Sequence, residues 1–131
     1  MRLRLVLLAL PVFCIPLVAA DLSGEWKVDA TFDDASRARG WPEARGELVC
    51  TLKTDNGRVT GDGKPLKAAR GVPVAGELKG ENIRWQFDVV IQPGAAPVQM
   101  IYTGRLDQAQ TAVRGTFALA DFGGDFTAKK Q

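Results

Sequence analysis

The side chains that could carry out chemistry are few in this 131-residue chain, which contains no histidine. That absence excludes serine–histidine–aspartate and cysteine–histidine nucleophilic sites and imidazole zinc sites. Two carboxylate pairs remain, Asp33 with Asp34 and Glu43 with Glu47, and both lie in or beside a charged stretch typical of a solvated loop. A working acid–base pair needs a cleft that raises the pKa of one carboxyl group, and nothing in the pattern predicts one. We therefore expect no enzymatic activity, no cofactor and no metal site.

One segment has the residue types of a calcium-binding loop. Asp55, Asn56 and Gly57 are followed by Asp62, but this spacing does not supply the alternating oxygen ligands of such a loop. Asn-Gly readily adopts the positive φ angles of a type I′ turn. The segment therefore predicts a tight hairpin between two strands.

The first twenty residues have the pattern of an export signal. Two arginines precede an apolar stretch over residues 5–18, and small residues end the segment at Ala20. The apolar stretch is shorter than the ~20 residues of a membrane-spanning helix. We expect a signal peptide over residues 1–20, a single domain over residues 21–131, and a periplasmic or secreted location.

Removal of the predicted signal peptide changes the charge of the chain. Loss of its two arginines leaves the 15 acidic residues balanced by an equal number of basic ones. A neutral mature chain gives no argument for a nucleic-acid partner. A lipid anchor on Cys14 is not expected either, because the bulky Phe13 precedes it where a lipidation signal has a small residue.

Cys50 is the single cysteine of the predicted mature chain, so it cannot form an internal disulfide. It alternates with Leu48 and Leu52, which is typical of the apolar face of a strand. We expect Cys50 to be a buried core residue; a reactive thiol or a dimer bridge is the alternative.

Alternating apolar and polar side chains run through most of the mature chain. In the first segment Trp26, Val28, Ala30 and Phe32 point one way and the intervening polar residues point the other. Residues 33–45 and 63–70 are expected to be irregular, and no segment has a helical period. The predicted strands are residues 24–32, 46–54, 58–62, 71–78, 83–91, 98–106, 111–119 and 124–129.

Eight strands joined in series by turns and loops predict an antiparallel meander. Such a meander closes, because closure removes its two exposed edges. The charged residues share one face of the strands and the large apolar residues share the other, whereas a transmembrane barrel places apolar side chains outside. We therefore expect an all-β, eight-stranded, antiparallel up-and-down barrel with no membrane insertion.

Short motifs at the two ends carry a family resemblance. Gly24-Glu25-Trp26 near the start and the terminal Phe126-Thr127-Ala128-Lys129-Lys130 resemble the calycin architecture of lipocalins, avidins and bacterial inhibitors of secreted zinc proteases. The whole mature chain is similar to a loosely defined set of bacterial secreted lipocalin-like domains. The resemblance implies that Gly24 and Trp26 close one end of the barrel, with Lys129 or Lys130 packed against the indole of Trp26.

The chain departs from two members of that group at their functional sites. Avidins hold biotin with polar residues, whereas the first strand here presents Val28, Ala30 and Phe32 inward, so we expect no biotin site. The protease inhibitors insert a free N-terminal trunk and carry a disulfide. Here almost no trunk precedes Gly24, and the mature chain has no second cysteine.

Six residues are candidates for a ligand site. Trp41 lies among charged and small residues and is either a lid that contacts a ligand or a cap folded over the open end of the barrel. The other five point inward and are Trp85, Phe87, Met100, Tyr102 and Phe117. They either line a cavity or fill the interior, because an eight-stranded barrel is just wide enough for either arrangement. Tyr102 is the predicted polar anchor, because a buried tyrosine hydroxyl usually finds a partner.

These features predict an exported, non-catalytic, lipocalin-like module that binds a small apolar or amphipathic ligand at the barrel mouth. The alternative is a periplasmic protein-interaction or protease-inhibitor-like barrel with a filled interior, docking through rim residues such as Arg37, Arg39 and Arg45. The pattern indicates neither the identity of a ligand nor the oligomeric state.

Overall fold

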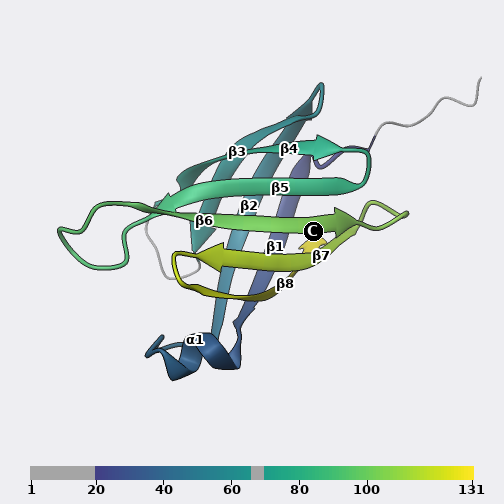
Figure 1. Ribbon diagram of the computed structural model, residues 1–131. Coiled ribbons are helices and arrows are strands. Elements are labelled where there is room, and N and C mark those ends of the chain that lie inside the picture. The colour runs from purple at the N-terminus through teal and green to yellow at the C-terminus, as the bar shows by residue number, and fades with distance from the viewer. Residues whose placement is uncertain (1–19, 66–69) are drawn as a thin grey trace, which may run out of the picture.

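The computed structural model describes residues 20–65 and 70–131 and forms a closed antiparallel barrel (Figure 1). Each strand pairs with the next along the chain, and the last pairs back onto the first. The strands are β1 (Gly24–Phe32), β2 (Arg45–Asp55), β3 (Arg58–Pro65), β4 (Val72–Lys79), β5 (Asn82–Val89), β6 (Val98–Leu106), β7 (Ala112–Leu119) and β8 (Phe122–Lys130). The predicted fold class is confirmed. Residues 1–19 of the predicted signal peptide lie outside the described residues.

The alternating side chains sort onto the two faces of the barrel wall as the pattern predicts. In β1 the side chains of Trp26, Val28, Ala30 and Phe32 are buried, and the polar residues between them are exposed or half-buried. The same alternation in the other strands fills the interior with large apolar side chains, which form one continuous core. Burial of this apolar surface is the main force that stabilises the fold.

A short helix lies within the long loop expected over residues 33–45, so this segment is not irregular throughout. Helix α1 (Asp34–Ala38) follows Asp33, whose side chain accepts a hydrogen bond of 2.8 Å from the backbone N–H of Ser36. This N-cap holds the pKa of the Asp33 carboxyl below its ordinary value. A single helical turn is too short for the sequence period to reveal, and the cap and its tertiary contacts hold it in place.

Strand β3 extends to Pro65, beyond the expected end at residue 62, and takes in part of the segment expected to be irregular. Its pairing with β2 continues through Cys50↔Gly63 to Leu48↔Pro65. A Cβ atom at Gly63 would lie 3.2 Å from side-chain atoms of Leu48 and Val74. The missing side chain therefore leaves room for the core residues of β2 and β4.

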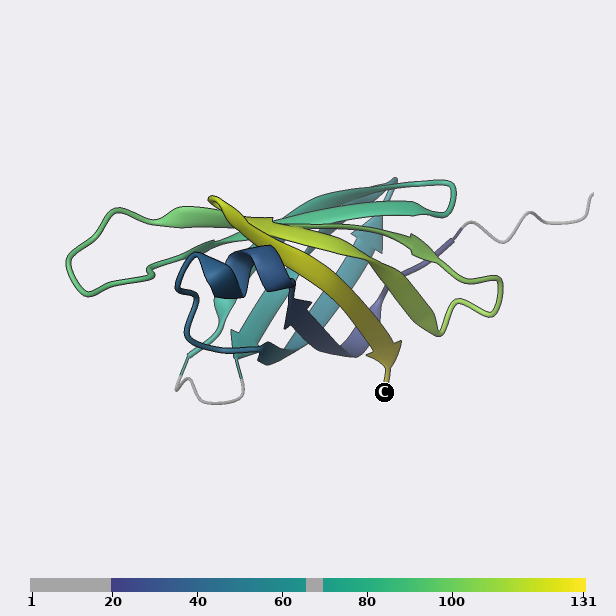
Figure 2. The same cartoon turned by 60° about the horizontal axis from the view of Figure 1, so that its bottom comes forward.

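Strand β5 ends at Val89, two residues earlier than expected, so the prediction that residues 90 and 91 belong to this strand is wrong. The pairing of β5 with β6 begins at Val89↔Val98. Residues 90–97 therefore form a loop that projects beyond the barrel, as Figures 1 and 2 show. Val90 and Ile91 in this loop are 55% and 38% exposed.

The two ends of the barrel are built differently. At one end the connections are tight turns, and Asn56 and Gly57 adopt the positive φ angles of the predicted hairpin. Leu22 is buried at this end, and its carbonyl oxygen accepts a 2.8 Å hydrogen bond from the indole N–H of Trp26. The other end, the α1 end, carries α1 and the 90–97 loop. No helix in residues 20–65 or 70–131 is long and apolar enough to cross a membrane.

Closure of the barrel requires close backbone approach at Gly124, which we predict to be intolerant of a side chain. A Cβ atom there would overlap the carbonyl oxygen of Thr31 on β1. Gly124→Ala should lower the free energy of unfolding by about 1–3 kcal/mol, because the strands must separate to admit the methyl group. Urea denaturation monitored by circular dichroism measures the change.

Gly46→Ala is the matched control, because no heavy atom lies within 4 Å of a Cβ atom at that strand glycine. Alanine there should be neutral or slightly stabilising, since it restricts the unfolded chain. Equal stability of the two variants would contradict the role of Gly124 in closure.

Candidate functional site

The five predicted inward candidates lie together around Tyr102. Trp85 on β5 and Phe117 on β7 are its cross-strand partners. The ring of Trp85 stacks on that of Tyr102 at a centroid distance of 5.3 Å, and the rings of Phe87 and Phe117 lie 5.8 Å from it. Met100 is two residues away on β6, with its Sδ atom 3.6 Å from the Tyr102 hydroxyl. The structure therefore brings these residues together as one aromatic cluster.

Tyr102 sits in a nonpolar environment. Its side chain is fully buried, and its hydroxyl donates only to the Met100 sulfur, a weak acceptor. Burial raises the pKa of Tyr102 above its ordinary value, and the nearby Cys50 thiol raises it further. The phenol is therefore neutral at physiological pH and serves as a packing residue with spare hydrogen-bonding capacity.

Trp85 carries a buried hydrogen-bond donor without a partner. Its indole N–H makes no hydrogen bond within the described part of the chain, and the side chain is 1% exposed. An unpaired buried donor costs about 1–3 kcal/mol. This N–H, the likewise unpartnered indole N–H of Trp41 at the edge of the core and the Tyr102 hydroxyl could each satisfy a polar group of a ligand.

The barrel interior is filled by its own side chains. Its buried core includes residues from all eight strands, and every inward ligand candidate belongs to it. Neighbouring aromatic rings contact one another across the interior, such as Tyr102 with Phe126 at 4.9 Å. A ligand in the interior would require some of these side chains to move. The prediction of a bound small molecule remains a prediction.

Trp41 folds over the α1 end of the barrel. Its ring stacks on Phe32 at 4.6 Å with an interplanar angle of 24°, and it lies 4.9 Å from the ring of Phe122. These contacts place it on the edge of the core, half-buried. This position agrees with the capping interpretation of Trp41; a lid would have to break both ring contacts.

Helix α1 positions Trp41 through one serine. The Ser36 hydroxyl accepts a 2.8 Å hydrogen bond from the N–H of Gly123 and donates to the Gly123 carbonyl oxygen at 3.1 Å. The N–H of Trp41 in turn donates to the Ser36 carbonyl oxygen. Ser36 thus connects the helix to β8, a role that its residue type alone does not reveal.

The predicted closure residues lie where β1 meets β8. Trp26 is paired with Lys130, on the same face of the barrel wall. The side chain of Lys130 runs across Gly24, because a Cβ atom added to Gly24 would lie 3.1 Å from Lys130 Cε. Lys129 is paired with Lys27 and faces outward. Of the two lysines, only Lys130 is on the face that carries Trp26.

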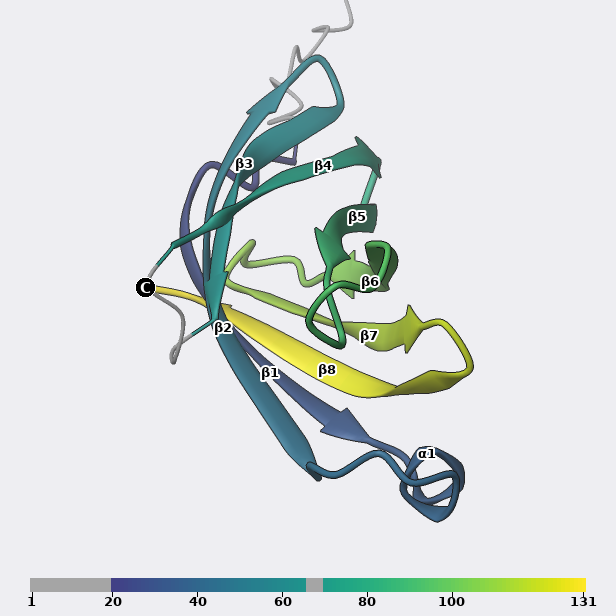
Figure 3. The ribbon, with the colours of Figure 1, turned by 90° about the vertical axis from the view of Figure 1, so that its left-hand side faces the viewer.

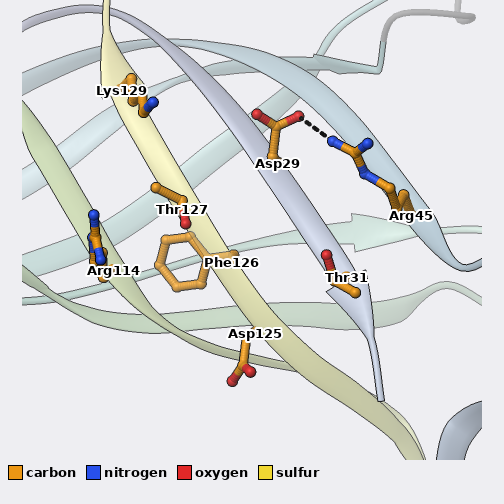
Figure 4. Close-up of a pocket in the computed structure, with 8 residues that line it drawn as sticks. All are labelled: Asp29, Thr31, Arg45, Arg114, Asp125, Phe126, Thr127 and Lys129. Carbon is orange, nitrogen blue, oxygen red and sulfur yellow. Dashed lines mark ion pairs between the residues drawn. The ribbon is translucent and has the colours of Figure 1, made fainter. Parts of the chain in front are cut away.

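A hollow of about 410 Å³ lies on the outer wall where β8 runs between β7 and β1 (Figure 4). Arg45 Nη2 lies 3.7 Å from Asp29 Oδ1, and Arg114, Lys129 and Asp125 also line the hollow. The hollow is open and mixes both signs of charge, so it favours neither an anion nor a cation. The sequence pattern predicts Arg45 as a rim residue and Lys129 as a closure residue, but it does not predict a hollow here.

A second outer hollow, of about 280 Å³, lies between β4 and β5 near the α1 end. Outward residues of both strands line it, and so do the inward residues Val72 and Phe87. Phe87 was predicted to face the interior alone, but it also lines this hollow. Pro73 also lines this hollow. A proline within a strand weakens its pairing, so Pro73 was the feature of the sequence that indicated an interruption here.

The buried thiol predicts how stability depends on pH. Burial raises the pKa of Cys50 from 9.0 to about 12. Below pH 9.0 the Cys50 thiol is protonated in both the folded and the unfolded state. Between pH 9.0 and about 12 the thiol loses its proton in the unfolded state but keeps it in the folded state. Stability should therefore fall as pH rises from 9.0, with a slope approaching about 1.4 kcal/mol per pH unit from this group.

Cys50→Ala isolates that contribution. The variant should be less stable at neutral pH because of the cavity, but its stability should fall less steeply between pH 9 and 10, as followed by urea titrations at each pH. The same slope in both proteins would show that the thiol does not titrate with folding.

Removal of the Ser36 hydroxyl should loosen the α1 end. Ser36→Ala leaves the Gly123 N–H without its acceptor, so we expect a loss of about 1–3 kcal/mol of stability and faster hydrogen exchange at the Gly123 amide. Ser23→Ala, at the opposite end of the barrel, is the matched serine control and should leave that exchange rate unchanged. Unaltered protection of Gly123 in Ser36→Ala would contradict the anchoring role.

The chain matches no known protein-family model, and a search of curated proteins found no match for it. The closed, eight-stranded, antiparallel up-and-down barrel is consistent with a lipocalin-like or calycin-like architecture. The contacts and surfaces of the barrel itself therefore carry the functional inference.

Proposed function

We propose that this protein is an exported, non-catalytic binding module that holds a protein partner on the outside of its α1 end. The observation that carries the proposal is the contrast between a filled interior and the exposed apolar loop 90–97. Export is supported by the basic and apolar pattern of residues 1–20. Binding without catalysis is supported by the lack of histidine.

The 90–97 loop has the composition of a contact surface. No charged residue occurs from Val89 to Gly104, and Val90 and Ile91 expose much of their surface. Interface centres are typically depleted in charge and contain large apolar side chains. The loop projects away from the barrel in Figure 1, so a partner could reach it without disturbing the core.

A small apolar ligand is the second candidate. The unpaired indole N–H of Trp85 supports it, because a ligand carbonyl or hydroxyl could satisfy that buried donor. Such a ligand would have to displace side chains that are already packed around Tyr102. The exposed loop therefore weighs more than the unpaired donor of Trp85.

The test is site-specific photo-crosslinking of the exported protein in its own cells, with a photoreactive amino acid at Ile91. We expect a covalent adduct to a protein from this position and none from Thr51, an exposed outward residue of β2 that serves as the control. Native mass spectrometry of the same preparation reports any co-purifying small molecule. No adduct at position 91, together with a bound mass of a few hundred daltons, would replace this proposal with the small-ligand candidate.

A further inference from the structure

The barrel wall opens between β4 and β5 near the α1 end. The last residue pair that joins these strands is Ala75↔Gln86. Beyond it, β4 continues to pair with β3 as far as Gly63↔Val72, and β5 continues to pair with β6 as far as Val89↔Val98. Among the described residues, both strands are thus paired on one side only over this stretch. Figure 3 shows β4 running away from β5 there.

Pro73 explains where the pairing stops. The N–H of Leu78 bonds to Gly57 beside β3, so alternate residues of β4, including Pro73, direct their backbone polar groups toward β5. Continuing the register beyond Ala75↔Gln86 places Pro73 opposite Asp88. Proline has no N–H to donate to the Asp88 carbonyl oxygen. The ladder therefore ends at Gln86, two residues short of Asp88.

The opening is lined by apolar side chains at its floor. Its volume is about 280 Å³, and Val72 and Phe87 reach it from the inner face of the wall. Val90 and Ile91 lie just beyond the end of β5 and are exposed. A chain that lay along β5 would cover both the floor and these two residues.

Carboxylates lie at and beside the opening, while the exposed Lys64 and Arg70 lie two residues along the chain from Asp62 and Val72. Asp88 is the one charged residue among those that line it, and Asp62 is paired with Pro73 on the adjacent strand β3. The carboxylate side chains of Asp88 and Asp62 are both exposed on the outer face of the wall. A basic residue in an occupant would complement them.

We propose that this opening takes an extended, apolar segment of a partner protein, bearing a lysine or arginine, which adds to the free edge of β5 at Asp88. The inference rests on the proposed protein-binding function and names the chemistry of the partner. An extended backbone supplies the N–H that Pro73 lacks, and its alternate side chains enter the hollow over Phe87. A small apolar molecule would fill the hollow but leave the Asp88 carbonyl oxygen without a donor.

Two synthetic peptides test the backbone contact on the unaltered protein. The first is a strand-length peptide of about six residues that alternates valine and threonine and has a lysine at each end; the second has the same side chains with its backbone amides N-methylated. Titrations followed by amide NMR shifts should show the first peptide binding near Phe87 and Asp88. The second should bind at least about tenfold more weakly, the effect of losing a backbone hydrogen bond.

Pro73→Val tests the same opening from the protein side. Valine restores the N–H, so β4 and β5 should pair as far as Asp88, slow hydrogen exchange there and reduce peptide affinity by about tenfold. Pro65→Val is the matched control, because Pro65 pairs with β2 and does not line the opening. It should leave peptide binding unchanged. A version of the peptide with glutamates in place of its lysines should bind more weakly than the parent.

Equal binding of the N-methylated and parent peptides, or no binding of either, would overturn the inference. So would self-association of the free protein that Pro73→Val abolishes, because the occupant would then be a second copy of this chain. These results are separable from the crosslinking test. A protein adduct at position 91 without peptide binding would leave the proposed function standing and remove only the opening as its site.

Discussion

Closure of the sheet by pairing of β8 with β1 is the constraint on which the rest of the structure depends. The pairing runs from Trp26↔Lys130 to Phe32↔Gly124 and leaves the inward side chains of all eight strands facing a narrow interior. These side chains can escape water only by packing against one another. The aromatic cluster around Tyr102 and the elevated pKa values of Tyr102 and Cys50 are consequences of that burial.

A filled barrel directs recognition to its outer surface. Within the described part of the chain, the spare polar groups in and at the edge of the core include the indole N–H groups of Trp85 and Trp41 and the Tyr102 hydroxyl. The outer surface offers the apolar 90–97 loop and the hollow beside Pro73. Both outer features lie at the α1 end, which carries the long connections over residues 33–44 and 90–97, whereas the opposite end has tight turns such as Asn56-Gly57. The fold thus combines a rigid core with one end that is free to make contacts.

The fold was predictable because each signal in the chain was local and periodic. Alternation located all eight strands, and Asn56-Gly57 located a hairpin. Helix α1 was not predictable, because one turn of helix has no period and Ser36 acts through Gly123, which is 87 positions away in sequence. The end of β5 was also missed, because Val90 and Ile91 continue an apolar run and only the start of β6 decides where pairing stops.

By itself, the sequence determined the fold class, the inward face of each strand and the absence of histidine-based chemistry, because each of these follows from residue type and near-neighbour spacing. The tertiary structure alone decided that the inward candidates pack together, that Trp41 stacks on Phe32, and that the wall opens where Pro73 comes opposite Asp88. Those outcomes depend on how strands distant in sequence are registered. Register is set jointly by all the pairings of a closed barrel, because a shift in one strand must be matched by its neighbours.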